Sequence, residues 1–376
     1  MKACRESRRD KAQPAKVYTI PIRTPKTVDI YCVGGAVRDT LLGRAGADTD
    51  YTVLNCLQAD FIRAFPRARK VGQAHPVFLV HGRQYTLSSA PCIDEDLKTR
   101  DLTVNALATD AQGYLYAHPM ALADLAGKVL RPVATDNFFQ DPLRVIRAAR
   151  FSSCLPEFAL APDLKDLMHL VASRGLLAGL APERVGHEVR MACQCPRPGR
   201  FIRILAETSS LQPWLAELGN IRVREAARSM DLAAGKESRV WMALMQSMTS
   251  RPSGSGHAED TAEGQMAAEL GTRLRLPKEM IAAGRCAAAW SRAAASYLDL
   301  EPSLRVKLLL DLSAHNIVED LLAIIATHCR TEPISQARRD LQTILNVHLP
   351  PAWRNLGPRS GAHLHALRCQ ALRGSR

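Results

Sequence analysis

The chain has few aromatic residues and no long apolar run. Phenylalanine, tryptophan and tyrosine make up 5% of its 376 residues, which argues against recognition of nucleic-acid bases by stacking on an aromatic platform. No uninterrupted apolar stretch is long enough to span a bilayer, so we expect no membrane partner. The N-terminus is basic and polar without an apolar core, and we expect no secretory signal there.

The chain also lacks the cysteine spacing of a metal site. Of its ten cysteines, only Cys193 and Cys195 lie close together in the sequence, and no CxxC pair or Cys/His cluster has zinc spacing. Scattered cysteines of this kind predict reduced thiols and a cytoplasmic protein.

Acidic residues are outnumbered. The net charge is +13, and residues 351–376 contain five arginines and no acidic residue. Such an excess favours a polyanionic partner whose binding weakens steeply with salt, although an arginine-rich proteome would produce the same excess. Together with the scarcity of aromatic residues, it favours recognition of phosphates and shape.

A glycine pair separates a short apolar run from a helix-like segment. The run ends at Val33, Gly34 and Gly35 follow, and the segment AVRDTLLG carries Arg38. Glycines at such a junction let a phosphate approach the backbone N–H groups of a helix N-terminus, where the helix dipole favours anions. The junction predicts a phosphate cradle in which Gly34 and Gly35 with Arg38 hold phosphates, whereas a glycine pair alone would indicate only a turn.

Two aspartates, Asp48 and Asp50, lie at the start of the next β-type run, YTVL. Side chains alternate along a strand, so both carboxylates point to the same face. Paired carboxylates are hard oxygen ligands that suit Mg²⁺. A lone DxD would indicate a solvated loop, but after a phosphate cradle it predicts nucleotidyl transfer, with Asp48 and Asp50 as metal ligands and catalytic residues.

The segment GGAVRD-x-LLG followed by DxD resembles the nucleotidyltransferase superfamily of the DNA polymerase β type. More narrowly, it resembles the class II branch of bacterial tRNA CCA-adding enzymes and poly(A) polymerases. The segment VGQAHPVFLVHG resembles the corresponding strand of CCA-adding enzymes. Poly(A) polymerases carry a basic sequence at that place, so the segment favours the CCA-adding type. The resemblance implies tRNA as partner with no DNA expected, CTP and ATP as substrates, and Mg²⁺ as cofactor.

The resemblance also implies an α+β fold, with a polymerase-β-like head of mixed sheet and flanking helices before an all-helical neck, body and tail. The residue pattern agrees, because the β-type runs DIYCV, PVFLV, RQYTLS and GYLYA give way to helical periodicity from Asp141 onward. We expect a flexible basic extension (1–28), a nucleotidyltransferase head (29–138) and a helical neck and body that binds tRNA and nucleotide (139–250). The rest (257–376), beyond the break RPSGSG, is expected to be a helical C-terminal region that resembles a degenerate HD domain. In the segment VWMALMQSM before the break, Gln246 and Ser247 stand where the His-Asp pair of an HD domain would lie.

A second motif, DLKTRDLTVNALATD, resembles the RRDxxxN motif of the family. The resemblance implies that Arg100, Asp101 and Asn105 hydrogen-bond the nucleotide sugar and phosphate. The first arginine of the family motif is Thr99 here, which removes one positive charge.

A third motif, FFQDPLRVIRAARF, resembles the EDxxR template motif, in which Asp141 and Arg144 would read the Watson–Crick edge of the incoming base. Arg147 follows one turn later and is a further nucleotide-binding candidate. The arginines could instead form a solvated or phosphate-facing stripe, an interpretation we prefer for Arg150. The glutamate of the family motif is Gln140.

Later segments distinguish the possible functions. LAPERVGHEVRMA resembles an ERxxxE motif, with Glu183, Arg184 and Glu188, which we interpret as structural support. YTLSSAPCIDEDLK leaves no room for the flexible arginine-bearing loop associated with the switch from CTP to ATP. A CC-adding enzyme therefore stays an alternative to a CCA-adding one. A catalytically impaired tRNA-binding paralogue is another, because His118 also replaces a family aspartate; a poly(A) polymerase is the least favoured.

Overall fold

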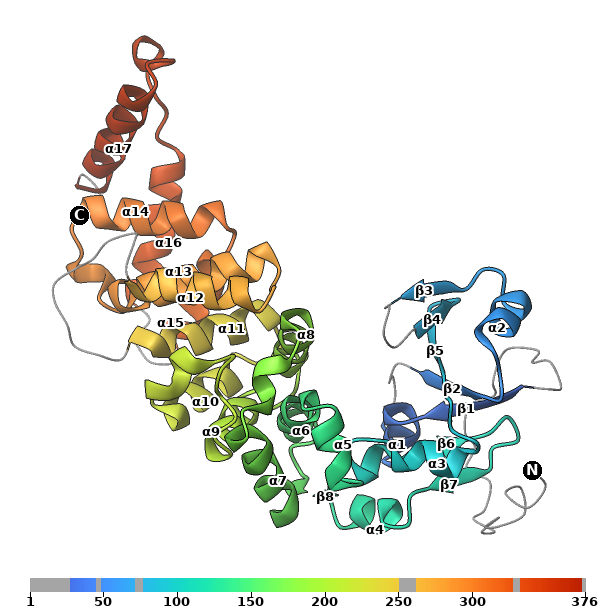
Figure 1. Cartoon of the computed structure of the whole chain (residues 1–376). Helices are drawn as coiled ribbons and strands as arrows, with labels where there is room; N and C mark the ends of the chain where they lie inside the picture. Colours follow the sequence, from blue (N-terminus) through green and yellow to red (C-terminus); the bar gives the residue numbers. More distant parts are fainter. Residues whose placement is uncertain (1–27, 45–48, 72–76, 250–261, 327–331, 374–376) are drawn as a thin grey trace. The chain divides into compact units, whose positions relative to one another are not determined.

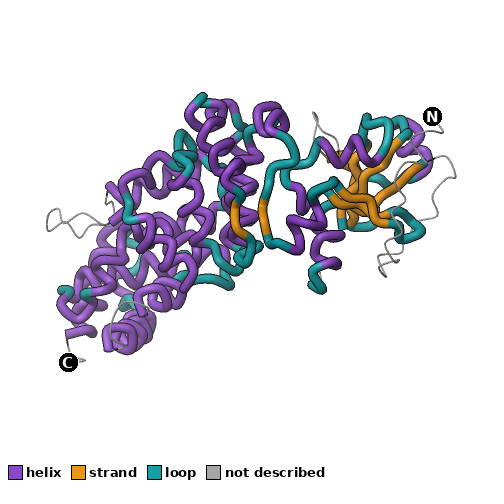
Figure 2. The backbone as a smooth tube through the Cα atoms, turned by 90° about the horizontal axis from the view of Figure 1, so that it is seen from below, coloured by secondary structure: helices purple, strands orange, loops and turns teal. Residues whose placement is uncertain are grey.

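The protein is described by a computed structural model over residues 28–44, 49–71, 77–249, 262–326 and 332–373 (Figure 1). It divides into two compact units. The first unit consists of the chain up to Ala148 together with Glu157–Val171. The second unit consists of Ala149–Pro156 and the chain from Ala172 onward. Strands gather in the first unit, whereas the second is built from helices (Figure 2). Among the described helices, none combines the length and apolarity needed to cross a membrane.

The first unit is built around a seven-stranded mixed sheet in the order β3-β4-β5-β2-β1-β6-β7. Strands β2 and β5 are parallel, and all other neighbours in this sheet are antiparallel. The strands are β1 (Asp29–Val33), β2 (Asp50–Leu54), β3 (Arg69–Val71), β4 (Val77–Val80), β5 (Arg83–Leu87), β6 (Leu107–Thr109) and β7 (Leu115–Ala117). The four predicted β-type runs are confirmed as β1, β4, β5 and β7, and YTVL is confirmed within β2.

Helices cover both faces of this sheet. Helix α1 (Gly35–Leu41) and helix α2 (Gln58–Ala64) contribute Val37 and Phe61 to the core on one face, where the rings of Tyr51 and Tyr85 stack with centroids 4.8 Å apart. On the other face, Leu54 packs with two apolar residues of α3 (Ile93–Lys98). Alternation along β2 therefore directs Thr52 and Asp50 toward the α3 face.

Further helices, one 3₁₀ turn and two short strands complete the described chain up to Ser173. They are the 3₁₀ turn η1 (Thr103–Asn105), α4 (Ala121–Ala126), β8 (Val129–Leu130), α5 (Thr135–Gln140), α6 (Leu143–Cys154), β9 (Ala159–Leu160) and α7 (Pro162–Ser173). The predicted helix at DPLRVIRAARF is confirmed as α6. The expectation that only helices follow the head is wrong in one place, because β9 pairs with β8 in a two-stranded parallel sheet. A two-residue strand carries too little alternation to be visible in the sequence.

The remaining elements are helical. The α-helices are α8 (Pro182–Cys193), α9 (Gly199–Glu207), α10 (Val223–Leu232), α11 (Glu237–Gln246), α12 (Ala262–Arg273), α13 (Lys278–Ala295), α14 (Pro302–Ala314), α15 (Val318–Ala326), α16 (Glu332–Leu345) and α17 (Pro358–Arg373). The 3₁₀ turns are η2 (Leu176–Gly179), η3 (Ala216–Asn220), η4 (Ser247–Thr249), η5 (Tyr297–Asp299) and η6 (Pro351–Trp353). Helices α9 and α10 approach so closely that a Cβ on Gly199 would lie 2.0 Å from the Ala227 carbonyl oxygen. Only glycine fits there.

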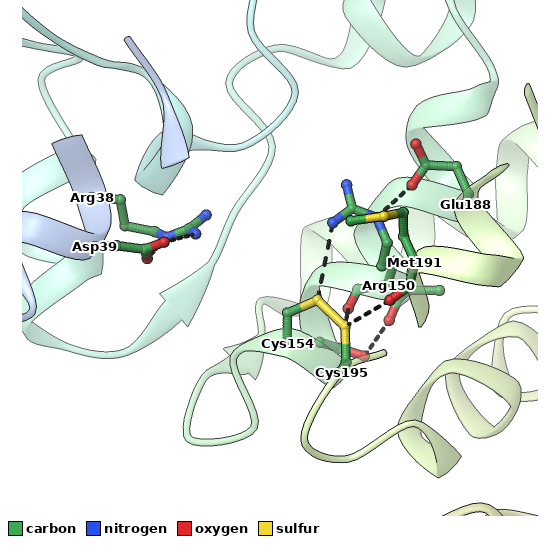
Figure 3. Close-up of a disulfide and its surroundings, with 9 residues drawn as sticks. Arg38, Asp39, Arg150, Cys154, Glu188, Met191 and Cys195 are labelled. Atoms are coloured by element: carbon green, nitrogen blue, oxygen red, sulfur yellow. Dashed lines mark hydrogen bonds and ion pairs between the residues drawn. A yellow bond between two sulfur atoms is a disulfide. The ribbon is translucent and has the colours of Figure 1, made fainter. Parts of the chain in front are cut away.

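The expectation that all ten cysteines are reduced is wrong for one pair. Cys154, at the end of α6, forms a disulfide with Cys195, just after α8 (Figure 3). The two residues are 41 positions apart in the sequence, and their Cα atoms lie 4.6 Å apart. Sequence spacing could not show this pairing, because the packing of α6 and α8 within the second unit brings the two sulfurs together.

Candidate active site

Strand β1 enters α1 through the glycine pair. Gly34 has a φ of +71°, a left-handed conformation that glycine adopts without strain, and its N–H donates to the Leu107 carbonyl oxygen at 2.9 Å. No side chain caps the N-terminus of α1. The backbone here has the form that the phosphate-cradle prediction requires, and the binding role of Gly34 and Gly35 stays a prediction.

Asp50 lies at the same edge of the sheet as the glycine pair. In the β1–β2 register, Val33 is the partner of Asp50, so the last residue before Gly34 lies opposite this aspartate. Asp50 is exposed, as a metal ligand that meets substrate must be. Asp48 lies outside the described residues, so the predicted pair of metal ligands is represented by one member.

Arg100 reaches the face of β2 that carries Asp50. Its Nη2 donates to Thr52 Oγ1 at 2.8 Å and to Asp96 Oδ2 at 2.6 Å. Thr99, which replaces an arginine of the family motif, ends α3 instead, and its Oγ1 donates to the Asp96 carbonyl oxygen at 2.7 Å. In the second motif, Arg100 therefore lies beside the sheet edge where the metal is expected, whereas Thr99 makes a hydrogen bond that ends α3.

Arg38 is buried and joins the first motif to the second. Its Nη1 donates to Asn105 Oδ1 at 2.6 Å. Its Nε and Nη2 donate to the Asp39 carboxylate at 2.8 and 3.0 Å (Figure 3). The guanidinium is thus held by side chains of α1 and η1. Asn105, predicted to contact nucleotide, also fixes Arg38.

Asp101 joins the second motif to the third. Its Oδ1 accepts hydrogen bonds from Asn105 Nδ2 at 3.1 Å and from the Leu102 N–H at 2.8 Å, and Arg147 donates to its Oδ2 at 2.8 Å. Burial alone would raise the pKa of the Asp101 carboxyl, but the charge of Arg147 and these hydrogen bonds outweigh it and hold the pKa well below its usual range. Asp101 is therefore a buried, charged carboxylate that links the second motif to the third.

Arg144 carries a buried donor without a partner. Its Nη1 has no hydrogen-bond acceptor among the described residues. Burial lowers the pKa of its guanidinium, and the carboxylates of Asp101 and Asp141 oppose that shift. A buried unsatisfied donor is costly, so this nitrogen is a suitable place for an acceptor on a bound ligand. This nitrogen is the observation that supports the prediction that Asp141 and Arg144 read a base.

The three arginines of α6 do not behave alike. Arg147 is held by Asp101, whereas Arg150 donates from Nε to Glu188 Oε2 at 2.5 Å (Figure 3). The interpretation of Arg150 as part of a solvated or phosphate-facing stripe is therefore wrong, because α8 supplies a buried carboxylate for it. The structural role expected for Glu188 is confirmed, and Glu183 instead pairs with Arg275 at the surface.

Removing Glu188 should destabilise the second unit. Only 12% of the Arg150 side chain and 5% of the Glu188 side chain are exposed, so Glu188→Ala leaves a guanidinium unpaired in a buried place. We expect a loss of about 3–5 kcal/mol in the free energy of unfolding, measured by urea denaturation. Glu225→Ala breaks the exposed Arg222–Glu225 pair and should cost no more than about 1 kcal/mol. Equal losses in the two variants would contradict the role of Glu188.

The second unit contains another group of metal-type ligands. Cys286, Asp311 and His315 are the group of three that the described residues offer. Arg285 Nη2 lies 2.5 Å from Asp311 Oδ1 and 3.2 Å from Cys286 Sγ, so a guanidinium already supplies positive charge there. Trp290 Nε1 also donates to Asp311, at 2.6 Å. We interpret this group as a structural ion pair.

The partners at the candidate site that were missed from the sequence alone include Thr52 and Asp39. Thr52 has a signal, because it lies two positions after Asp50 on β2 and therefore shares its face. Asp39 has none, because its pairing with Arg38 depends on side-chain conformations that adjacent positions do not determine.

Comparison with known proteins identifies relatives over half of the chain. The multifunctional CCA protein of Xanthomonas oryzae pv. oryzae is 38% identical over 213 residues, 50% of this chain and 51% of that protein. Proteins of the same name from Stenotrophomonas maltophilia and Burkholderia mallei are 38% and 35% identical over 212 and 215 residues, again 50% of this chain and 52% and 51% of theirs. The chain thus spans about half the length of the curated relatives it matches. No family model matches it.

Solved structures share the fold over most of the chain. The Bacillus stearothermophilus CCA-adding enzyme in complex with CTP superimposes with a TM-score of 0.66 at 24% identity, covering 93% of this chain and 89% of that one. The Thermotoga maritima CCA-adding enzyme complexed with tRNA gives 0.65 at 20% identity, covering 92% and 88%. The protein has the fold of CCA-adding enzymes. The expected α+β fold and the resemblance to the CCA-adding type are confirmed.

Proposed function

We propose that this chain is a tRNA nucleotidyltransferase that adds CMP and AMP to the tRNA 3′ end from CTP and ATP in the cytoplasm. One observation carries the proposal: a glycine junction and an exposed aspartate lie opposite each other at one edge of the sheet, with Arg100 on the face of that aspartate. The similarity to multifunctional CCA proteins supports it. The domain boundaries expected from the sequence are part of the same proposal.

In this proposal each motif has a distinct task. Gly34 and Gly35 let the nucleotide phosphates approach the backbone N–H groups at the start of α1. Arg100 and Asn105 position the nucleotide. Asp141 and Arg144 read the edge of the base, with the free Arg144 donor supplying one hydrogen bond.

The carboxylates Asp48 and Asp50 would hold the metal. Hard oxygen ligands fit Mg²⁺, and Asp50 is exposed at the sheet edge. When bound, the ion supplies Lewis-acid activation of the RNA 3′-hydroxyl and stabilises the charge on the pyrophosphate leaving group. Asp50 contributes a fixed negative charge, and Arg100 is anchored by Thr52 and Asp96 on the same face.

A CC-adding enzyme is the second candidate, and one observation favours it. Strand β5 ends at Leu87 and α3 begins at Ile93, so only residues 88–92 join them. All five are described, and they leave no room for a long flexible loop between β5 and α3. Efficient addition of the last adenosine would require another segment to take over that role.

The product formed on tRNA that lacks its 3′ CCA tests these functions together. We expect two added nucleotides with CTP alone and a third when ATP is also present, resolved on a sequencing gel. Two nucleotides in both reactions would identify the CC-adding alternative. Tight tRNA binding with no CMP incorporation would identify a catalytically impaired paralogue and overturn the proposal, and long A tracts on generic RNA would indicate a poly(A) polymerase.

A further inference from the structure

Four side chains form a continuous hydrogen-bonded chain through the three motifs. Arg38 donates to Asn105, Asn105 donates to Asp101, and Arg147 donates to Asp101, at 2.6, 3.1 and 2.8 Å. Arg38 comes from α1, Asn105 from η1 and Arg147 from α6, so the chain crosses from the glycine junction to the base-reading helix. Asp101 is its central acceptor, with only 7% of its surface exposed.

Arg147 and Arg144 are neighbours on α6 and yet differ in their partners. At positions i and i+3 they share one face of the helix. Asp101 receives both Nε and Nη2 of Arg147, each at 2.8 Å, whereas Nη1 of Arg144 is buried with no acceptor among the described residues. Asp101 therefore engages two nitrogens of Arg147, whereas Nη1 of Arg144 is left for a ligand.

The charges near Arg144 also support different roles for Arg144 and Arg147. The family glutamate that precedes Asp141 is Gln140 in this chain, and Gln140 is neutral and exposed. The carboxylates that act on the Arg144 guanidinium are those of Asp101 and Asp141. An ionised Asp101 thus provides near Arg144 the negative charge that Gln140 does not.

We propose that Asp101 is a positioning residue for base selection, which holds Arg147 away from the incoming nucleotide and keeps Arg144 in place to read its base. The inference rests on the proposed function and deepens it. Arg147, predicted from the sequence to bind nucleotide, then acts through Asp101. Without the carboxylate, Arg147 becomes a second guanidinium that can donate to a wrong base.

Asp101→Asn tests this link with little change in shape. The amide oxygen can still accept from Asn105 and the Leu102 N–H, but its NH₂ group cannot accept from Arg147. The measurement is the ratio of kcat/KM for CTP to that for UTP in single-nucleotide addition to tRNA lacking its 3′ CCA. We expect the ratio to fall about tenfold or more, as for the loss of one charge-assisted hydrogen bond.

A second variant approaches the same link from the other partner. Arg147→Gln leaves the Asp101 carboxylate without its guanidinium, which should draw Arg144 toward Asp101 and also lower the CTP-to-UTP ratio. The double variant Asp101→Asn, Arg147→Gln removes both charges and should restore the ratio toward that of the wild type. Such non-additivity is the signature of direct coupling, whereas two residues that acted independently would add their losses. If Asp101→Asn alone does not fold, comparing the CTP-to-UTP ratio of Arg147→Gln with that of the double variant still tests the link.

Asp124→Asn is the matched control. Asp124 is also buried in the same unit and lies outside the three motifs; its carboxylate accepts hydrogen bonds from Arg131 and from Thr103, and only Thr103 belongs to the second motif. This variant should lower the midpoint of thermal unfolding without changing the CTP-to-UTP ratio. An unchanged ratio in folded Asp101→Asn or Arg147→Gln, or an equal fall in Asp124→Asn, would overturn the inference. Wild-type protein that adds no CMP would instead refute the proposed function itself.

Discussion

Replacing Asp48 and Asp50 together with alanine is expected to lower nucleotide incorporation at least about a thousandfold while tRNA binding persists. Binding of a metal to two carboxylates stabilises the transition state by several kcal/mol, and each 1.36 kcal/mol corresponds to about a factor of ten in rate. We expect the RNA to be held mainly by positive charge elsewhere on this basic chain, so its affinity should change little. Single-turnover addition of CMP and a filter-binding assay measure the two quantities.

The control for this experiment removes negative charge without touching the sheet edge. Asp60 lies on α2, and its side chain is 51% exposed and paired with Arg63 at the surface. Asp60→Ala should retain wild-type incorporation within a factor of two or three, because exposed pairs contribute little. Thermal unfolding of each variant checks that the fold survives. Incorporation that persists in the folded double variant would remove Asp48 and Asp50 from the catalytic site.

The fold was predictable from the sequence to the extent that it depends on local periodicity and on motif order. The β-type runs DIYCV and RQYTL identified strands, and the transition to helices after Asp141 was visible as helical periodicity. Strands β3 and β6 were not predicted, since three residues carry too little alternation. Their pairing depends on neighbours distant in the sequence, and that information is not local.

At the candidate site, residue types were easier to predict than partners. The sequence indicated Arg38, Asn105 and Arg147 as nucleotide contacts, because a charged or amide side chain in a motif suggests a ligand. The structure pairs Arg38 with Asn105, 67 positions away, and Arg147 with Asp101, 46 positions away. Which groups satisfy one another and which donor is left over depends on three-dimensional packing, so only the structure distinguishes Arg144 from Arg147.

The free donor on Arg144 leads to the second large effect that we expect. Arg144→Ala should reduce kcat/KM for both CTP and ATP about a hundredfold, because it removes the guanidinium that we propose reads the base edge. Arg144→Lys retains the charge but loses the planar fork, so it should recover only a small part of the activity. A purely electrostatic role would instead be restored by lysine. The measurement is steady-state addition of each nucleotide to tRNA lacking its last nucleotides.

The outcome for Arg144 also separates base reading from helix stability. Nη1 of Arg144 makes no hydrogen bond to the described residues, so removing it takes away no internal hydrogen bond at that nitrogen, and the thermal midpoint should change far less than in Glu188→Ala. Arg222→Ala removes an exposed arginine and should leave kcat/KM unchanged. A large loss of stability with proportional loss of activity would mean that Arg144 supports α6. A loss of activity in a stable protein would place this nitrogen against the base, since a buried donor then finds its acceptor only in the nucleotide.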